Sequence, residues 1–242
     1  MSEKHIQCED ETLIIAIDGP AASGKSTTAR LVADKLGYMY IDTGAMYRAV
    51  TLKTIRRFGA QYTEEDVAAL LPETHIELRR EDNHSAHTSI KVFLDDEEVT
   101  SDIRSQEVSA EVSRVSAIPR VRERLVALQR EMSKNERVVL DGRDIGTVVF
   151  PHADVKVYLV ASIEERARRR QKELQDQSAA TLNASIDDLA ARLATRDRFD
   201  STRDHSPLSC APDALRLDTT NMTIECQVEA VLELASQGIK KI

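Results

Sequence analysis

The chain has 242 residues, of which 41% are hydrophobic and 31% are charged, so its composition is that of a folded domain and excludes a disordered chain. Its net charge of −8 argues against a protein that coats nucleic acid, and its apolar runs are too short to cross a membrane. Three widely spaced cysteines and a polar start without a signal-peptide pattern predict a cytoplasmic protein. The absence of a sustained apolar heptad pattern favours a monomer.

Apolar, β-branched runs recur along the chain, and the first four lead into a polar turn and a helical pattern. Continuous apolar strands that alternate with helices predict a parallel sheet covered by helices on both faces. The expected strands are residues 13–17, 38–41, 137–140, 155–160 and 214–217. We therefore expect an α/β fold with a five-stranded parallel sheet, whose functional loops follow the C-terminal ends of the strands.

Two segments interrupt this alternation. Residues 60–105 contain a short helical pattern and an acidic turn at Asp95 and Asp96 between apolar runs, which predicts a small antiparallel sheet. Residues 164–204 contain two charged helices around a polar stretch, 175–185, that we expect to be mobile. The layout predicts an insert (60–105) and a helical lid (164–204) on a core. We assign residues 12–59, 106–163 and 205–242 to that core.

The sequence IDGPAASGKSTTAR, residues 17–30, contains the pattern G-x-x-x-x-G-K-[ST] after an expected strand and before an expected helix. Its glycines let successive N–H groups converge on a phosphate, Lys25 can reach the β- and γ-phosphates, and Ser26 can ligate Mg²⁺. The loop therefore predicts a site for a nucleoside triphosphate with Mg²⁺. The expected ATP-binding residues are Gly19, Pro20, Ala21, Ala22, Ser23, Gly24, Lys25, Ser26 and Thr27.

A phosphate-binding loop is shared by GTPase switches, motor ATPases and small-molecule kinases, so it does not settle the reaction. The chain has no Asn-Lys-x-Asp motif for guanine, and DGRD at 141–144 stands where a switch would have D-x-x-G. Asp141 lies where such proteins often keep a carboxylate directed at the metal, which we expect it to reach through water. A kinase needs a second site for the acceptor.

Two polar motifs begin where expected strands end and are candidates for that acceptor site. In DTGAMYR (42–48), Thr43 is expected to cap the next helix, and Arg48 in its second turn can grip a phosphate with two hydrogen bonds. In DGRDIGTVVF (141–150), Arg143 and Asp144 place a cation and an acceptor side by side.

Further arginines gather in the expected lid. EERARRR (164–170) supplies Arg169 and Arg170, which could deliver positive charge to the transferring phosphoryl group. In RDRFDSTR (196–203), Arg196, Asp200 and Arg203 are spaced to share one helical face, where two cations flank a carboxylate.

These motifs, together with SQEVSAEVSRVSAIPRVRERL, RDRFDSTRDHSPL and LDTTN, occur in an order that resembles the bacterial cytidylate kinases from about Leu13 to Leu234. The resemblance implies a P-loop kinase core with an enlarged acceptor-binding insert and a lid. It also implies transfer of the γ-phosphoryl group of ATP to CMP or dCMP with Mg²⁺. The small-molecule partners would be ATP and CMP or dCMP, without nucleic acid.

The resemblance implies a role for each matching residue. Arg48, Arg143 and Arg203 would hold the CMP phosphate, with Thr43 beside it, and Arg196 and Asp200 would contact the ribose. Ser113, Arg122 and Asp144 would read the base, because an acceptor beside two donors matches the edge of cytosine and not that of uracil. The implied catalytic residues are Lys25, Arg143, Arg169 and Arg170.

Two alternatives stay open from the residues alone. Another P-loop kinase, acting on shikimate, gluconate or dephospho-coenzyme A, would present a hydroxyl acceptor and would not need three arginines around it. A nucleotide-binding switch would hydrolyse its nucleotide slowly and carry a partner-binding face. The missing guanine motif and the two inserted segments count against the switch.

Overall fold

The structure, a computed structural model, describes residues 13–81, 89–177 and 184–239. The polar N-terminal segment, and residues 178–183 of the stretch expected to be mobile, lie outside the described residues. Within the described ranges, no helix is long and apolar enough to cross a membrane.

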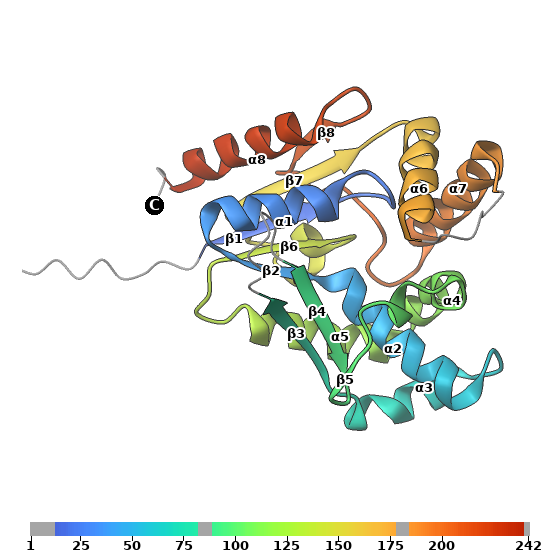
Figure 1. The fold of residues 1–242 in the computed structure, drawn as a ribbon. Helices are drawn as coiled ribbons and strands as arrows, with labels where there is room; N and C mark the ends of the chain where they lie inside the picture. Colours follow the sequence, from blue (N-terminus) through green and yellow to red (C-terminus); the bar gives the residue numbers. More distant parts are fainter. Residues whose placement is uncertain (1–12, 82–88, 178–183, 240–242) are drawn as a thin grey trace, which may run out of the picture.

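A five-stranded parallel sheet forms the centre of the molecule, as the sequence predicts (Figure 1). Its strands are β1 (Ile14–Asp18), β2 (Met39–Asp42), β6 (Val138–Gly142), β7 (Val155–Val160) and β8 (Leu215–Asp218), in the order β2-β6-β1-β7-β8. The parallel register sets Asp42 beside Asp141 and Asp18 beside Gly142. The loops that follow β1, β2 and β6 therefore leave the same edge of the sheet next to one another.

Helices cover both faces of this sheet. On one face lie α1 (Lys25–Leu36) and α8 (Ile224–Ile239), packed on Ile15 and Ile17 of β1. On the other lie α2 (Thr43–Phe58) and α5 (Pro119–Met132), with α4 (Gln106–Ala117) packed against α2. Ala16, between Ile15 and Ile17, belongs to this second core, as expected where successive side chains of a strand point to opposite faces.

A second, antiparallel sheet lies beside α2, as predicted for the segment 60–105 (Figure 1). It consists of β3 (Ile76–Glu81), β4 (Ser89–Leu94) and β5 (Glu97–Glu98), and it follows helix α3 (Glu64–Leu70) and a 3₁₀ turn (Leu71–Glu73). Asp95 and Asp96 form the expected acidic turn, both with positive φ. Arg56 of α2 binds Glu97 at 2.7 Å and Asp102, in the 3₁₀ turn Asp102–Arg104, at 2.8 Å. These ion pairs tie the small sheet to the helix that carries Arg48.

Helices α6 (Ile163–Gln177) and α7 (Ile186–Thr202) form a pair at one end of the molecule, where the sequence predicts a lid (Figure 1). They pack through Ala167, Leu189 and Leu193, and Ala21 and Ala22 of the P-loop lie against this small core.

One local prediction is wrong. Asp42, and not Thr43, caps α2, because its Oδ1 accepts a hydrogen bond from the N–H of Ala45 at 2.9 Å. Thr43 is the first residue inside the helix, and its hydroxyl donates to the carbonyl oxygen of Asp141 at 2.6 Å. The two strand ends are thereby joined.

Candidate active site

The segment Gly19–Ser26 forms the loop between β1 and α1. A Cβ on Gly19, whose φ is +149°, would lie 2.2 Å from the carbonyl oxygen of Leu159, so a side chain does not fit there. Gly24 precedes α1 with φ +96° and no side-chain cap, which leaves the first N–H groups of the helix free for an anion. Lys25 folds back over the loop, and its Nζ donates to the carbonyl oxygen of Pro20 at 3.1 Å. The loop has the features that bind phosphate.

A cavity of about 270 Å³ opens between this loop, α2, α4 and the α6–α7 pair. Eight cationic side chains line it: Lys25, Arg48, Arg104, Arg122, Arg143, Arg170, Arg196 and Arg203. Five carboxylates accompany them: Asp42, Asp141, Asp144, Glu173 and Asp200. The cavity therefore has an excess of positive charge in a chain whose net charge is −8.

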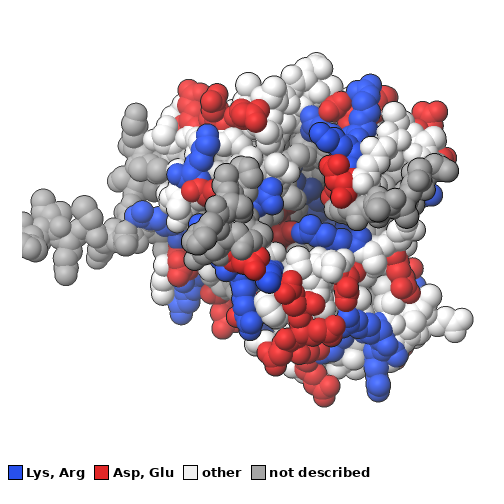
Figure 2. All heavy atoms as spheres, viewed as in Figure 1, with Lys and Arg blue, Asp and Glu red and all other residues white. Residues whose placement is uncertain are grey.

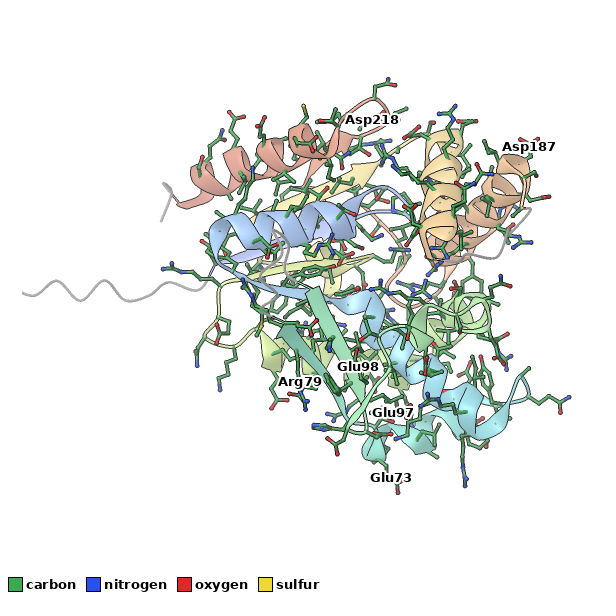
Figure 3. The ribbon with its side chains drawn as sticks, viewed as in Figure 1. Glu73, Arg79, Glu97, Glu98, Asp187 and Asp218 are labelled. Carbon is green, nitrogen blue, oxygen red and sulfur yellow. The ribbon has the colours of Figure 1, made fainter. Side chains whose placement is uncertain are left out.

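The space-filling view shows basic side chains in the recess between the α6–α7 pair and the elements below it (Figure 2). Much of the negative charge lies elsewhere. Glu73, Asp187 and Asp218 project from the periphery of the molecule (Figure 3). This distribution favours an anionic ligand in the recess.

The cavity brings together four arginines from three parts of the chain: Arg48, Arg143, Arg196 and Arg203. Arg48 donates to the carbonyl oxygen of Ile103 at 3.2 Å and to Ser109 Oγ at 2.9 Å. Arg143 Nε donates to Asp200 Oδ2 at 3.1 Å, and Arg196 Nε lies 3.9 Å from the same oxygen. Asp200 thus forms a hydrogen-bonded ion pair with Arg143 and a longer ion pair with Arg196.

Burial and mutual repulsion lower the pKa of three of these arginines. Burial, and then the charge of Arg170, lower the pKa of Arg48 to about 10. Burial, and then Arg143, lower the pKa of Arg196 to about 9. The pKa of Arg203 is lowered by burial and by Arg122, and its Nη2 is buried without a hydrogen-bond partner among the described residues. Guanidinium groups in such surroundings are suited to bind an anion such as phosphate.

A buried ion pair lies at the inner end of the cavity. Arg122 Nη2 donates to Asp144 Oδ2, and each of the two residues is only 4% exposed. Arg122 Nη1 also donates to the carbonyl oxygen of Ser116 at 3.1 Å, and its guanidinium lies 5.4 Å from the ring centre of Tyr47. A planar ring that enters here would meet a carboxylate, a guanidinium and an aromatic face.

Between the P-loop and β6 lies a cluster built around Asp141. Ser26 Oγ and Tyr40 OH each donate to one of its carboxylate oxygens, both at 2.7 Å. Burial, and then the charge of Asp42, raise the pKa of Asp141, while burial and Arg143 lower the pKa of Lys25. The cluster offers oxygen ligands next to the loop that would hold the triphosphate.

The structure brings most of the predicted site residues to this cavity. The residues that line it are Ala21, Ala22, Lys25, Ser26, Thr43, Arg48, Arg122, Asp141, Arg143, Asp144, Arg170, Arg196, Asp200 and Arg203. Those that do not line it are Gly19, Pro20, Ser23, Gly24, Thr27, Ser113 and Arg169. Five of these seven belong to the P-loop and the start of α1, but Ser113 and Arg169 lie apart from the cavity. Ser116, one turn after Ser113 on α4, lines it instead.

Several residues of the cavity and of its immediate surroundings were not expected from the sequence. Asp42 and Tyr47 belong to the DTGAMYR motif, so their position in that motif was an available signal. Tyr40 and Arg104 carried no such signal, because their contribution depends on contacts between distant parts of the chain. Asp18, at the end of β1, accepts hydrogen bonds from the N–H groups of Ile145 and Gly146 at 2.8 and 2.7 Å. It thereby joins the start of the P-loop to the π-helical turn Ile145–Val149 that follows Asp144.

Comparison with known proteins gives a consistent result. The model of the cytidylate kinase family matches residues 15–237. The cytidylate kinase of Chloroherpeton thalassium is 51% identical over 234 residues, which cover 95% of this chain and 96% of that protein. The cytidylate kinase of Chlorobaculum tepidum is 45% identical over 236 residues, with 96% and 97% covered.

Among solved structures, an uncharacterized protein from Eubacterium ventriosum superposes with a TM-score of 0.52 at 9% identity, covering 94% of this chain and 99% of that one. That likeness concerns the fold alone. The match of the family model and the identity to the curated relatives extend over nearly the whole chain. The chain therefore belongs to the cytidylate kinase family.

Proposed function

We propose that the protein transfers the γ-phosphoryl group of ATP to CMP or dCMP, with the P-loop as the donor site and the arginine-lined cavity as the acceptor site. One observation carries the proposal. Lys25 and Ser26 of the P-loop line the same cavity as an excess of arginines, so two phosphate-bearing ligands can face each other there. Membership of the cytidylate kinase family supports the choice of CMP as acceptor.

The acceptor phosphate is assigned to Arg48, Arg143 and Arg203. Their guanidinium groups can hold a phosphate with paired hydrogen bonds. A bound phosphate would offset the burial that lowers the pKa values of Arg48 and Arg203. Thr43 lies beside them. Arg196 and Asp200 are assigned to the ribose. A kinase with a hydroxyl acceptor would not need three arginines around the attacking group.

The base is assigned to the inner end of the cavity. Asp144 would accept a hydrogen bond from the exocyclic amine of cytosine, and Arg122 would donate to its ring nitrogen or carbonyl. Uracil has a carbonyl in place of the amine, so it would leave the buried carboxylate without a donor. Ser113 stays a prediction from the resemblance, because its side chain does not line the cavity. Its carbonyl oxygen instead accepts a hydrogen bond from Ser116 Oγ at 3.0 Å.

The residues around Asp141 fit Mg²⁺. Hydroxyl and carboxylate oxygens are the ligands this ion prefers, and in kinases it takes only one or two of them from the protein because phosphates and water supply the rest. Ser26 would ligate the ion directly and Asp141 through water. When bound, the ion would neutralise charge on the β- and γ-phosphates.

The protein itself has little covalent chemistry to perform, because the acceptor is already a phosphate anion and no general base is required. Arg48, Arg143 and Arg203 position the attacking oxygen in line with the γ-phosphorus, and Lys25 neutralises charge that develops on the transferring group. Arg170, which lines the cavity and donates to Glu173 at 2.7 Å, would add to that charge. Movement of the proposed lid (164–204) and the proposed insert (60–105) toward the core (12–59, 106–163 and 205–242) would exclude water and limit ATP hydrolysis.

We also propose that the enzyme works as a monomer in the cytoplasm. In support of the location, the two described cysteines, Cys210 and Cys226, are both free, which is usual in a reducing compartment.

A coupled assay of ADP release tests the proposal. ATP is supplied with CMP, dCMP, UMP, AMP, shikimate or no acceptor. We expect rapid turnover with CMP and dCMP, slow turnover with UMP, and almost none with AMP, shikimate or no acceptor. Turnover with shikimate instead of CMP, or acceptor-independent hydrolysis at the full rate, would refute it.

A further inference from the structure

Two arginines of α6 bind the outer side of the P-loop, where the proposed mechanism has no use for them. Arg166 Nη1 donates to the carbonyl oxygen of Ala21, and Arg169 Nη1 donates to that of Ser23, both at 3.1 Å. Arg166 is only 6% exposed and is held by Asp197 at 2.6 Å. Figure 1 shows α6 standing beside the loop between β1 and α1. Arg169 therefore meets the P-loop from outside the cavity.

A third residue completes this contact. Thr219 belongs to the segment LDTTN, residues 217–221, for which the proposed mechanism gives no role. It is fully buried, and its Oγ1 lies 2.9 Å from the carbonyl oxygen of Ser23. Arg169 Nη2 donates to the carbonyl oxygen of Thr219 at 2.6 Å. The Ser23 carbonyl thus accepts from Arg169 and has the Thr219 hydroxyl as a second available donor, although the Val160 carbonyl oxygen also lies 3.0 Å from that hydroxyl.

The backbone between the two anchored carbonyls is strained. Ala22 has a φ of +59°, in the left-handed region that costs a residue with a side chain roughly 1 kcal/mol. Such a conformation persists only when its surroundings impose it. Arg166 holds the carbonyl before Ala22, and Arg169 with Thr219 holds the carbonyl after it. The three side chains are placed to impose it.

We propose that Arg166, Arg169 and Thr219 are positioning residues that hold the P-loop in its phosphate-binding conformation through its outward-facing carbonyl oxygens. In a planar trans peptide the C=O and N–H point in opposite directions, so a carbonyl held outward turns the following N–H inward. The Ser23 carbonyl shares its peptide with the N–H of Gly24. A cationic donor on that carbonyl also polarises the peptide and strengthens its N–H as a donor.

This inference rests on the proposed function only in taking the P-loop as the site of the donor nucleotide. It differs from a catalytic role for Arg169, which would affect turnover and leave donor affinity unchanged. A positioning role predicts loss of donor affinity even when no acceptor is present. It also predicts that removal of the strain at Ala22 compensates for loss of the arginine.

Calorimetric titration of ADP in magnesium buffer, without acceptor, tests the inference. We expect Arg169→Ala to weaken ADP binding about tenfold, the loss that corresponds to one hydrogen bond to a charged group. CMP affinity, titrated separately, should change less than twofold. Arg168→Ala is the matched control, because Arg168 is the adjacent residue on α6, and its side chain is 61% exposed and pairs only with Glu165 in the described structure. The ADP affinity of Arg169→Lys should lie between that of the wild type and that of Arg169→Ala.

A rescue experiment separates positioning from simple loss of charge. Ala22→Gly in the Arg169→Ala background should recover at least threefold of the lost ADP affinity, because glycine adopts the left-handed conformation without cost. Thr219→Val, which keeps the shape and removes the hydroxyl, should also weaken ADP binding. If Arg169→Ala does not fold, the ADP affinities of Arg169→Lys and Thr219→Val test the inference in its place.

ADP affinity equal to wild type in the variants that fold, or lower turnover with ADP affinity unchanged, would overturn the inference. So would equal losses of ADP and CMP affinity. Failure of the wild type to bind ADP would instead refute the proposed function.

Discussion

Arg196 carries a charge that the folded protein holds at a cost when no ligand is present. Burial first, and the charges of Arg143 and Arg48 second, lower its pKa from the ordinary arginine value to about 9. Since a lowered pKa means that folding disfavours the protonated form, this charge lowers the free energy of unfolding at pH 7. The penalty is relieved only as the pH rises above about 9. We predict that Arg196→Met stabilises the ligand-free protein and weakens its binding of CMP.

The magnitude follows from the structure. A tenfold change in proton affinity is worth about 1.4 kcal/mol, so the whole shift corresponds to about 5 kcal/mol. The side chain of Arg196 is 26% exposed, and screening by solvent reduces the recoverable part to about 1–2 kcal/mol. Asp200 keeps Arg143 as a partner at 3.1 Å, so no carboxylate is stranded. Loss of about two charge-assisted hydrogen bonds should weaken CMP binding about 100-fold.

Urea denaturation with and without CMP, together with calorimetric titration of CMP, measures both effects. Arg192→Met is the control, because Arg192 lies one turn earlier on α7 and is exposed. We expect the control to change neither quantity. The reasoning is refuted if Arg196→Met lowers the free energy of unfolding of the ligand-free protein by more than about 1 kcal/mol, or if it binds CMP as tightly as the wild type does.

Three further substitutions test other parts of the account. Asp144→Asn should reduce the ratio of kcat/KM for CMP over UMP by about 100-fold in steady-state assays, since an amide can donate to uracil; an unchanged ratio would contradict our assignment of the base. Gly142→Ala should destabilise the protein by about 1–3 kcal/mol in urea denaturation, because a Cβ would lie 2.7 Å from Ile145 Cδ1 and 2.9 Å from Thr43 Oγ1. Burial raises the pKa of Asp18 from 3.8 to about 7 against two backbone hydrogen bonds, so its contribution to stability is present below 3.8 and lost as the pH rises through about 7. Between pH 5 and pH 8, the free energy of unfolding of Asp18→Asn should therefore rise by about 2–3 kcal/mol relative to that of the wild type in the same assay. If the difference between the two proteins does not change with pH, the titration of Asp18 is not coupled to folding.

The features that are determined by residues adjacent in the sequence were predictable from the sequence. The P-loop is a run of eight consecutive residues with a strand before it and a helix after it, and most of the five strands are mainly apolar runs. The acidic turn of the small sheet lies where the sequence places it, because Asp95 and Asp96 tolerate positive φ.

The orientation of helix faces was not predictable in the same way. Arg169 and Arg170 are adjacent, so they point about 100° apart on α6, and only the packing of that helix decides which one lines the cavity. Ser113 and Ser116 of α4 are closer in direction, about 60° apart, and packing again decides which of them lines the cavity. Tyr40 donates a hydrogen bond to Asp141, which is 101 residues away in the sequence, and no local pattern predicts such a contact.

Two titrations in one calorimeter test the central claim that the cavity is built for an already phosphorylated pyrimidine. CMP and cytidine share the base and the ribose and differ only in the phosphate that Arg48, Arg143 and Arg203 are proposed to hold. We predict that CMP binds at least 100-fold more tightly than cytidine, from about two charge-assisted hydrogen bonds, and that added salt narrows the difference. Equal affinities for the two ligands, unaffected by salt, would contradict the claim.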